Sequence, residues 1–168
     1  MRNVLLLRTG VIAGAAAAAA ISMQSAFAGT PEMHPVGVMM SGVHLHEHTA
    51  GKSFLDLGST GPGFGDELVG ANTLTAEDGS DAGTDSFVCT SVAADDSAFQ
   101  CDVVFSLKGG RVTAQGYAKI TGTAPLFDEK FAVTGGTGDY QRVTGQVRVL
   151  QSSGTDAELT LQLNRSRI

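Results

Sequence analysis

The sequence has few of the features that build helical, membrane-spanning or nucleic-acid-binding proteins. After residue 30, no stretch keeps a helical apolar period over three turns, so we expect no amphipathic helix. The apolar run over residues 11–21 is too short to span a bilayer comfortably, and no later run replaces it, so we expect no stable membrane anchor. Basic residues are also scarce, with eleven Lys and Arg against seventeen Asp and Glu. We therefore expect no partnership with nucleic acid or with anionic lipid surfaces.

The start of the chain has the organisation of a signal peptide. Two arginines precede the alanine-rich apolar stretch over 11–21, and the triplet Ala26-Phe27-Ala28 is typical of a cleavage site. No cysteine lies near Ala28, which argues against lipid attachment. We predict that residues 1–28 are removed on export and that the protein is secreted.

The chain beyond the signal peptide is acidic and rich in glycine. Its formal charge is −8, because residues 1–28 hold two of the eleven basic residues and none of the acidic ones. About 140 residues remain, enough for one domain with a hydrophobic core. Twenty of the twenty-two glycines lie there, which favours many short strands joined by tight turns and predicts an all-β domain. Residues 29–42, with Pro31 and Pro35, are expected to form a flexible lead-in.

The chain has only two cysteines, and both fall on the clearest predicted hairpin. Residues 84–92 and 98–107 alternate in polarity around an acidic turn. Pairing residues whose numbers sum to 190 sets Cys89 opposite Cys101. In an exported protein this arrangement predicts a disulfide, which would stabilise the fold by about 2–3 kcal/mol. A catalytic thiol would require Cys89 to stay reduced, which export disfavours. The same register puts one set of residues on a shared inner face: Phe87, Cys89, Cys101, Val103 and Phe105.

The first predicted strand, residues 43–49, places a carboxyl group among apolar side chains. Its alternation puts Leu45, Glu47 and Thr49 on one face and three histidines on the other. If the apolar residues mark the interior, Glu47 points inward with them. A buried carboxylate is costly unless it is hydrogen-bonded, so Glu47 is the leading candidate for a functional residue.

The histidines of this strand allow two interpretations. His44, His46 and His48, with His34 nearby, could bind a transition metal. However, neighbours on one face of a strand lie about 6.5–7 Å apart, so two can share an ion but three rarely do. We favour a solvated outer face and predict no metal site.

The stretch over residues 131–149, FAVTGGTGDYQRVTGQVRV, organises the end of the domain. Three glycines in four residues allow a tight reversal between paired strands. A phosphate-binding loop would need a following helix and usually a lysine, and neither is present. With residues 157–163 as the last strand, we count eight strand candidates and no helix. Eight antiparallel strands predict a closed barrel whose interior is either just filled or holds one small ligand.

The string VTGGTG-x-Y-x-x-V-x-GQVRV resembles the glycine signature of the allene oxide cyclase and dirigent barrel superfamily. Residues 143–149 are closer to the cyclase branch, because dirigent proteins usually carry Ala-Arg-Gly where this chain has Val-Thr-Gly. Gly65-Asp66, followed by a short apolar run and Asn72, is also similar to the cyclase pattern. The resemblance covers nearly all of a barrel domain over residues 43–164 and implies an eight-stranded β-barrel.

Carried over residue by residue, the resemblance implies a cyclase-like pocket. The catalytic glutamate of the cyclases falls on Glu47, their pocket asparagine on Asn72 and their cysteine on Cys89. Thr49 stands where the cyclases have a second asparagine, and the proline that they carry after this strand is missing. We take Glu47 and Asn72 as candidate catalytic residues. The candidate ligand-pocket residues are Thr49, Phe87, Cys89, Val103 and Phe105.

Three functions fit these observations. The barrel is an isomerase that folds a reactive intermediate before it cyclises, a dirigent-type binder without catalysis, or a secreted structural module with a filled interior. We favour a barrel that binds a small apolar, phenolic or oxidised molecule and needs no cofactor. The sequence leaves room for a homo-oligomer. A continuous apolar cavity of a few hundred cubic ångströms ending at Glu47 would support the first two functions.

Overall fold

The computed structural model describes residues 37–39, 42–58, 60–122 and 126–166. The predicted signal peptide and most of the predicted lead-in lie outside these residues. The described part of the chain is built from strands and one short 3-10 helix, η1, and contains no helix long and apolar enough to cross a membrane. The elements are β1 Gly37–Met39, β2 Val43–Leu55, β3 Glu67–Ala76, β4 Asp81–Ser91, β5 Ala98–Leu107, β6 Gly110–Lys119, β7 Phe127–Gly136, η1 Gly138–Tyr140, β8 Val143–Gln151 and β9 Asp156–Ser166.

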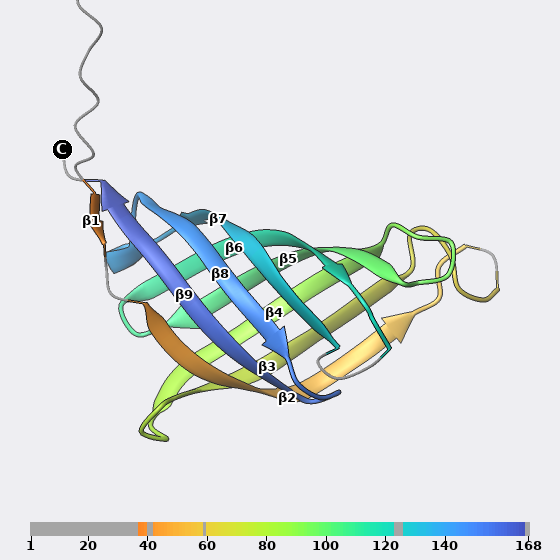
Figure 1. The fold of residues 1–168 in the computed structure, drawn as a ribbon, viewed down its shortest axis with the longest axis horizontal. Helices are drawn as coiled ribbons and strands as arrows, with labels where there is room; N and C mark the ends of the chain where they lie inside the picture. The colour runs from red at the N-terminus through yellow and green to blue at the C-terminus, as the bar shows by residue number, and fades with distance from the viewer. Residues whose placement is uncertain (1–36, 40–41, 59, 123–125, 167–168) are drawn as a thin grey trace, which may run out of the picture. The chain divides into compact units, whose positions relative to one another are not determined.

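The strands β2 to β9 close into an eight-stranded antiparallel barrel, as the sequence predicted. Each strand pairs with the next along the chain, and β9 pairs with both β8 and β2, so the sheet has no open side (Figure 1). The short strand β1 lies within the stretch expected to be flexible and pairs with β9 beyond the end of β2. Closure gives every barrel strand a hydrogen-bonded neighbour on both sides, although β2 and β9, and likewise β6 and β7, pair over only part of their length.

Several strands are longer than the sequence indicated. The first strand, predicted over residues 43–49, continues to Leu55 after a bulge between Thr49 and Gly51. The strand that leads into the glycine-rich stretch begins before residue 131, at Phe127. The polar residues after 163 continue β9, where they pair with β8. In each case cross-strand hydrogen bonds extend a strand into residues with no apolar alternation.

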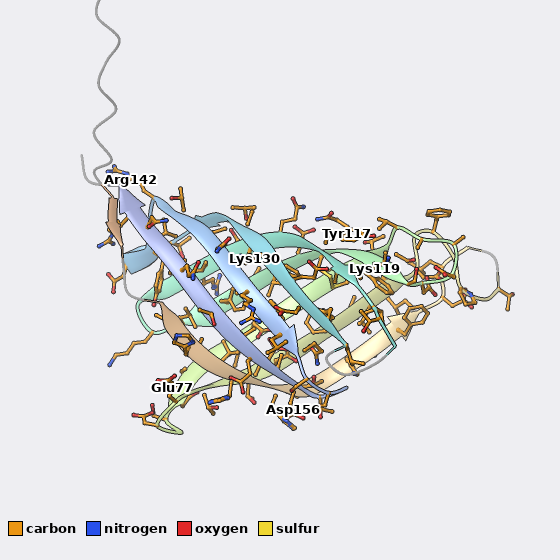
Figure 2. All side chains as sticks on the ribbon, in the orientation of Figure 1. Glu77, Tyr117, Lys119, Lys130, Arg142 and Asp156 are labelled. Carbon is orange, nitrogen blue, oxygen red and sulfur yellow. A yellow bond between two sulfur atoms is a disulfide. The ribbon has the colours of Figure 1, made fainter. Side chains whose placement is uncertain are left out.

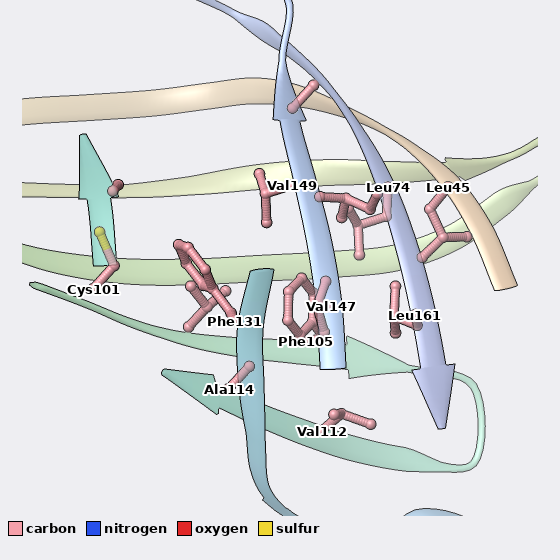
Figure 3. Packing of buried hydrophobic residues seen from close by; sticks show 14 of the residues in the cluster. Leu45, Leu74, Cys101, Phe105, Val112, Ala114, Phe131, Val147, Val149 and Leu161 are labelled. Carbon is pink, nitrogen blue, oxygen red and sulfur yellow. The ribbon is translucent and has the colours of Figure 1, made fainter. Parts of the chain in front are cut away.

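One end of the barrel is filled by a close-packed core. Leu45, Leu74 and Leu161 lie at this end, and Phe105 and Phe131 lie between them and Cys101 (Figure 3). Leu74, Phe105 and Leu161 are fully buried. The burial of these side chains supplies the main force that holds the barrel closed.

Two glycines inside strands make room for phenylalanine rings. A Cβ at Gly116 would stand 2.0 Å from the ring of Phe131, and a Cβ at Gly70 would stand 2.6 Å from the ring of Phe87. Such contacts are impossible for a real side chain, so each ring occupies the space that the glycine leaves empty. These positions explain part of the high glycine content that turns alone do not.

The predicted hairpin of β4 and β5 has the predicted register. Phe87 pairs with Val103 and Cys89 with Cys101, and the two cysteines form a disulfide. Both cysteine side chains are buried on the inner face of the barrel. The disulfide therefore belongs to the interior wall.

The glycine-rich stretch after β7 joins two strands and also packs against a second turn. Instead of a tight reversal, β7 and β8 are connected through η1. Gly138 has φ +60°, and a Cβ there would stand 2.1 Å from the carbonyl oxygen of Gly109. The backbone N–H of Asp139 donates to the same oxygen at 2.9 Å. The glycines thus allow the turn between β5 and β6 to approach closely.

The outer face of the barrel is mostly polar, with a few exposed apolar or aromatic side chains such as Phe54, Val88 and Tyr117. Side chains such as Lys119, Lys130 and Asp156 project away from the barrel wall (Figure 2). Arg148 on β8 forms two hydrogen bonds to Asp128 on β7, at 2.6 and 2.7 Å. Inside and outside are therefore separated by the alternation of each strand.

Candidate functional site

The barrel interior beyond the core is hollow. A cavity of about 160 Å³ begins at Phe105, Phe131 and Val149, which belong to both the core and the cavity wall. It reaches solvent beside Lys52 and Gly154, which are exposed. The interior is therefore filled at one end and open at the other, which disagrees with a barrel filled throughout.

The cavity wall is mostly apolar, with a few polar side chains. Five phenylalanines contribute to it: Phe87, Phe99, Phe105, Phe127 and Phe131. Six polar or charged residues also line it: Glu47, Thr49, Lys52, Asn72, Asp85 and Gln151. An apolar wall with a small number of polar groups is typical of a small-molecule site.

Three neighbouring strands bring two carboxyl groups and an amide together in this wall. Glu47 lies on β2, Asn72 on β3 and Asp85 on β4, all on the inner face. Asn72 and Asp85 pair across β3 and β4, and Nδ2 of Asn72 donates to Oδ1 of Asp85 at 2.8 Å. Both side chains are only 3% exposed. We call Glu47, Asn72 and Asp85 the carboxyl site.

Burial raises the pKa of both carboxyl groups. Burial raises the pKa of Glu47 to about 8, and the charge of Asp85 and a hydrogen bond between the two groups contribute to this rise. Burial also raises the pKa of Asp85, to about 6, although the hydrogen bonds that it accepts from Asn72 and Glu47 oppose this shift. Both shifts favour a pair that holds one proton between its two groups near neutral pH.

Three buried side-chain oxygens have no hydrogen-bond donor among the described residues: Asp66 Oδ2, Asn72 Oδ1 and Asp85 Oδ2. Asp66 lies outside the cavity, and its other oxygen accepts from the backbone N–H of Leu57 at 2.7 Å. A protonated Glu47 can supply a donor to Asp85. Oδ1 of Asn72 gains none, so the carboxyl site has more acceptors than donors.

The structure brings the residues singled out from the sequence into one cavity. Its wall includes both candidate catalytic residues and all five candidate pocket residues: Glu47, Asn72, Thr49, Phe87, Cys89, Val103 and Phe105. Cys89 is there as half of a disulfide and offers no thiol. Leu126 and Phe127, just before and at the start of β7, also contribute to the wall.

The sequence analysis missed Asp85, the partner of Glu47. The signal was present, because Asp85, Phe87 and Cys89 alternate along β4, and the predicted register sets Asp85 opposite Phe105. The reasoning that made Glu47 a candidate functional residue applies equally to an aspartate at an inward position of this hairpin. The pairing of Asp85 with Asn72 depends on the register between β3 and β4, which the sequence did not predict.

The histidines of β2 lie on the outer face and pair with β9. His46 Nδ1 lies 3.0 Å from Glu158 Oε1, and His48 Nδ1 lies 2.8 Å from Asp156 Oδ1. His44 lies opposite Thr160. Across the described residues, no group of three His, Cys, Asp or Glu side chains is placed to hold a metal ion. These three histidines thus lie on a solvated outer face, and the absence of a metal site stays a prediction.

Fold and cavity define the chain as a small closed β-barrel with a ligand-sized space inside. A scan against protein-family models and a search of the curated proteins both find no match. Similar solved structures include pyocyanin demethylase, with a TM-score of 0.64, 24% identity and coverage of 73% of this chain and 98% of that one. The Diels-Alderase AbmU from Streptomyces koyangensis has a TM-score of 0.60 and 16% identity over 75% of this chain and 64% of that one. An exo-specific intermolecular Diels-Alderase has a TM-score of 0.57 and 14% identity over 76% of this chain and 99% of that one.

These identities show a shared fold and no more. The neighbours are small barrels, in agreement with the barrel predicted here, and none of the three is named as an allene oxide cyclase. The cyclase resemblance thus stays a prediction from the sequence.

Proposed function

We propose that this barrel binds a small, mostly apolar molecule and uses Glu47 and Asp85 to move protons on it, as in an isomerisation or a ring closure. The observation that carries the proposal is a pair of buried carboxyl groups in the wall of an apolar cavity, where burial raises the pKa of both. Paired carboxyl groups with pKa values on either side of neutrality can act as acid and base at once.

The chemistry requires only these two side chains. Asp85, as the carboxylate, takes a proton from the ligand, and Glu47, as the neutral acid, gives one to another atom of the ligand. The hydrogen bond between the two groups then returns the proton from Asp85 to Glu47 and restores the starting state. The phenylalanine walls restrict the ligand to few conformers, which lowers the entropic part of the barrier.

The hydrogen bond of Asn72 argues against one alternative chemistry. An amide that stabilises a developing oxyanion must aim its N–H at the ligand. Here Nδ2 of Asn72 donates to Asp85, which is itself charged. In our proposal Asn72 is a positioning residue that orients Asp85 and lowers the cost of its charge.

The volume of the cavity limits the ligand. About 160 Å³ is close to the engineered apolar cavity of about 150 Å³ that admits benzene. It is smaller than the few hundred cubic ångströms of drug-sized sites. We propose ligands with one or two rings, or a folded chain of similar size.

The finer assignments rest on the sequence and on the names of the neighbours. Two of the three neighbours are named Diels-Alderases and the third a demethylase, so barrels of this fold hold small molecules during chemistry. We propose cyclase-like chemistry of the allene oxide cyclase type on this ground and on the glycine signature. We also propose that the protein works after export, where the oxidised cysteine pair would persist.

A proton-transfer probe tests this function. The small ketone cyclohex-3-enone rearranges to its conjugated isomer by moving one proton, and the product is followed by ultraviolet absorbance. We expect catalysis by the wild-type chain, and a loss of at least about tenfold in both Glu47→Gln and Asp85→Asn. The control is Asp102→Asn, which removes an exposed carboxylate on the outer face. If all three variants and the wild type give equal rates, the carboxyl site is not an acid–base site.

A further inference from the structure

The carboxyl site presents acceptors to the cavity and almost no donors. Its three side chains hold five oxygen acceptors, the one proton shared by the pair, and one amide group. The amide is directed at Asp85 at 2.8 Å, and Oδ1 of Asn72 is buried without a donor. A molecule that completes this site must therefore bring donors of its own.

No cation of the described chain neutralises the site. The positively charged residue in the cavity wall is Lys52, which is exposed and donates to the carbonyl oxygen of Gly154 at the mouth. Lys52 is five residues beyond Glu47 on β2, roughly 15 Å along the strand. It is not among the influences on the pKa of Glu47 or Asp85. The negative charge of the pair is thus left for a ligand to compensate.

The apolar part of the cavity favours the same kind of ligand. Five phenylalanine rings line it, and the faces of aromatic rings attract cations, most strongly where water is excluded. Aromatic rings also stack against one another. A flat aromatic body with a positive nitrogen would use both the rings and the carboxyl site.

We infer that the cavity takes a molecule with an aromatic body and a protonated amine, with the N–H groups against Glu47, Asn72 and Asp85 and the ring among the phenylalanines. This inference rests on the proposed ligand-binding function and specifies the class of ligand. An anionic group on the ligand would lie toward the mouth, where Lys52 is found, because the carboxyl site already carries negative charge.

Three probes of matched shape test the inference by calorimetry at pH 7. The cationic probe is 1-naphthylmethylamine and the neutral probe is 1-naphthalenemethanol. The anionic probe is 1-naphthaleneacetate, the carboxylate of 1-naphthaleneacetic acid. We expect the amine to bind at least about tenfold more tightly than the alcohol, and the anion to bind most weakly. Equal affinities of amine and alcohol, or tighter binding of the anion, would overturn the inference while leaving a ligand-binding cavity.

A double variant identifies the groups responsible. Glu47→Gln/Asp85→Asn keeps the shapes of both side chains and removes the charge. We expect the amine to lose at least about tenfold in affinity and the alcohol less than about threefold, whereas Asp102→Asn should change neither. A preserved preference for the amine in a folded double variant contradicts the inference. If none of the probes binds the wild-type chain at millimolar concentration, both the inference and the proposed function fail.

Discussion

The carboxyl group of Glu47 lies in an apolar wall, where its ionisation is unfavourable. This should lower the stability of the folded protein at a pH at which Glu47 is ionised. Its pKa is raised to about 8 in the folded state, and that of Asp85 to about 6. Between their ordinary values and these raised values, the folded state binds more protons than the unfolded state. The free energy of unfolding therefore falls as the pH rises through this range.

The expected result is a stability difference that grows with pH. Glu47→Gln should match the wild type below about pH 4, where Glu47 is mostly protonated in both the folded and the unfolded state, and be more stable near pH 9 by on the order of 2 kcal/mol. Urea denaturation at several pH values measures this, with Asp102→Asn as the control. If Glu47→Gln is less stable than the wild type at every pH, Glu47 is a structural residue.

A second residue-scale prediction concerns Gly116, which faces the ring of Phe131. Gly116→Ala would place a Cβ 2.0 Å from that ring and displace it from the junction of core and cavity. We expect a loss of about 1–3 kcal/mol in the free energy of unfolding, as in other overpacked cores. The matched control is Gly51→Ala, because nothing lies within 4 Å of a Cβ at Gly51. Equal effects of the two substitutions would show that the barrel wall adapts freely.

At the scale of the elements, the disulfide between β4 and β5 should stabilise the fold without being needed for the barrel to close. Cys89 and Cys101 are separated by twelve positions, so the loop that they close is short. The double change Cys89→Ala/Cys101→Ala should lower the free energy of unfolding by about 2–3 kcal/mol. Thermal denaturation with and without reductant is the measurement. A reductant effect that persists in the double variant would have to come from elsewhere.

The elements that the sequence predicted well are those whose register is specified by local pattern. The β4–β5 hairpin has a short turn and a two-sided alternation, so its pairing was predictable residue by residue. The length of β2 was not, because its bulge after Thr49 shifts the alternation and the extension contains Gly51 and Lys52. A bulge is imposed by the partner strands and has no strong local signature.

The candidate site was half predictable for the same reason. The alternation of the first strand placed Glu47 on the inner face and so identified it, and the family resemblance identified Asn72. The alternation of β4 also places Asp85 inward, but its contact with the amide of Asn72 could be recognised only once β3 and β4 were paired. A site formed by several strands can be predicted only when the register between those strands is known. Whether a single residue faces inward follows from the alternation of its own strand alone.

At the scale of the whole molecule, the barrel divides its interior between stability and binding. Leu74, Phe105 and Leu161 fill one end, and the carboxyl site lies in the wall of the hollow end. The packed core at the filled end stabilises the fold and so offsets the destabilisation caused by the buried carboxyl groups and the open cavity. Stability–function trade-offs of this kind are common at sites that hold charge away from water.

The maturation of the chain is a further whole-molecule prediction. We expect exported protein to begin at Gly29, because the triplet before it is typical of a cleavage site. N-terminal sequencing or intact mass of secreted material is the measurement. Secreted protein that still begins with Met1 would contradict the signal-peptide interpretation.

The central claim is that Glu47 and Asp85 share a single proton near neutral pH inside the cavity. Carbon-13 NMR of the side-chain carboxyl groups, titrated from pH 3 to pH 10, measures this directly, with Glu47→Gln and Asp85→Asn used to assign the two signals. We predict that the Glu47 signal titrates with a pKa of about 8 and that the Asp85 signal also titrates above its ordinary range. If both signals titrate independently near the ordinary pKa values of about 4, the pair holds no proton at pH 7 and the account of the site is wrong.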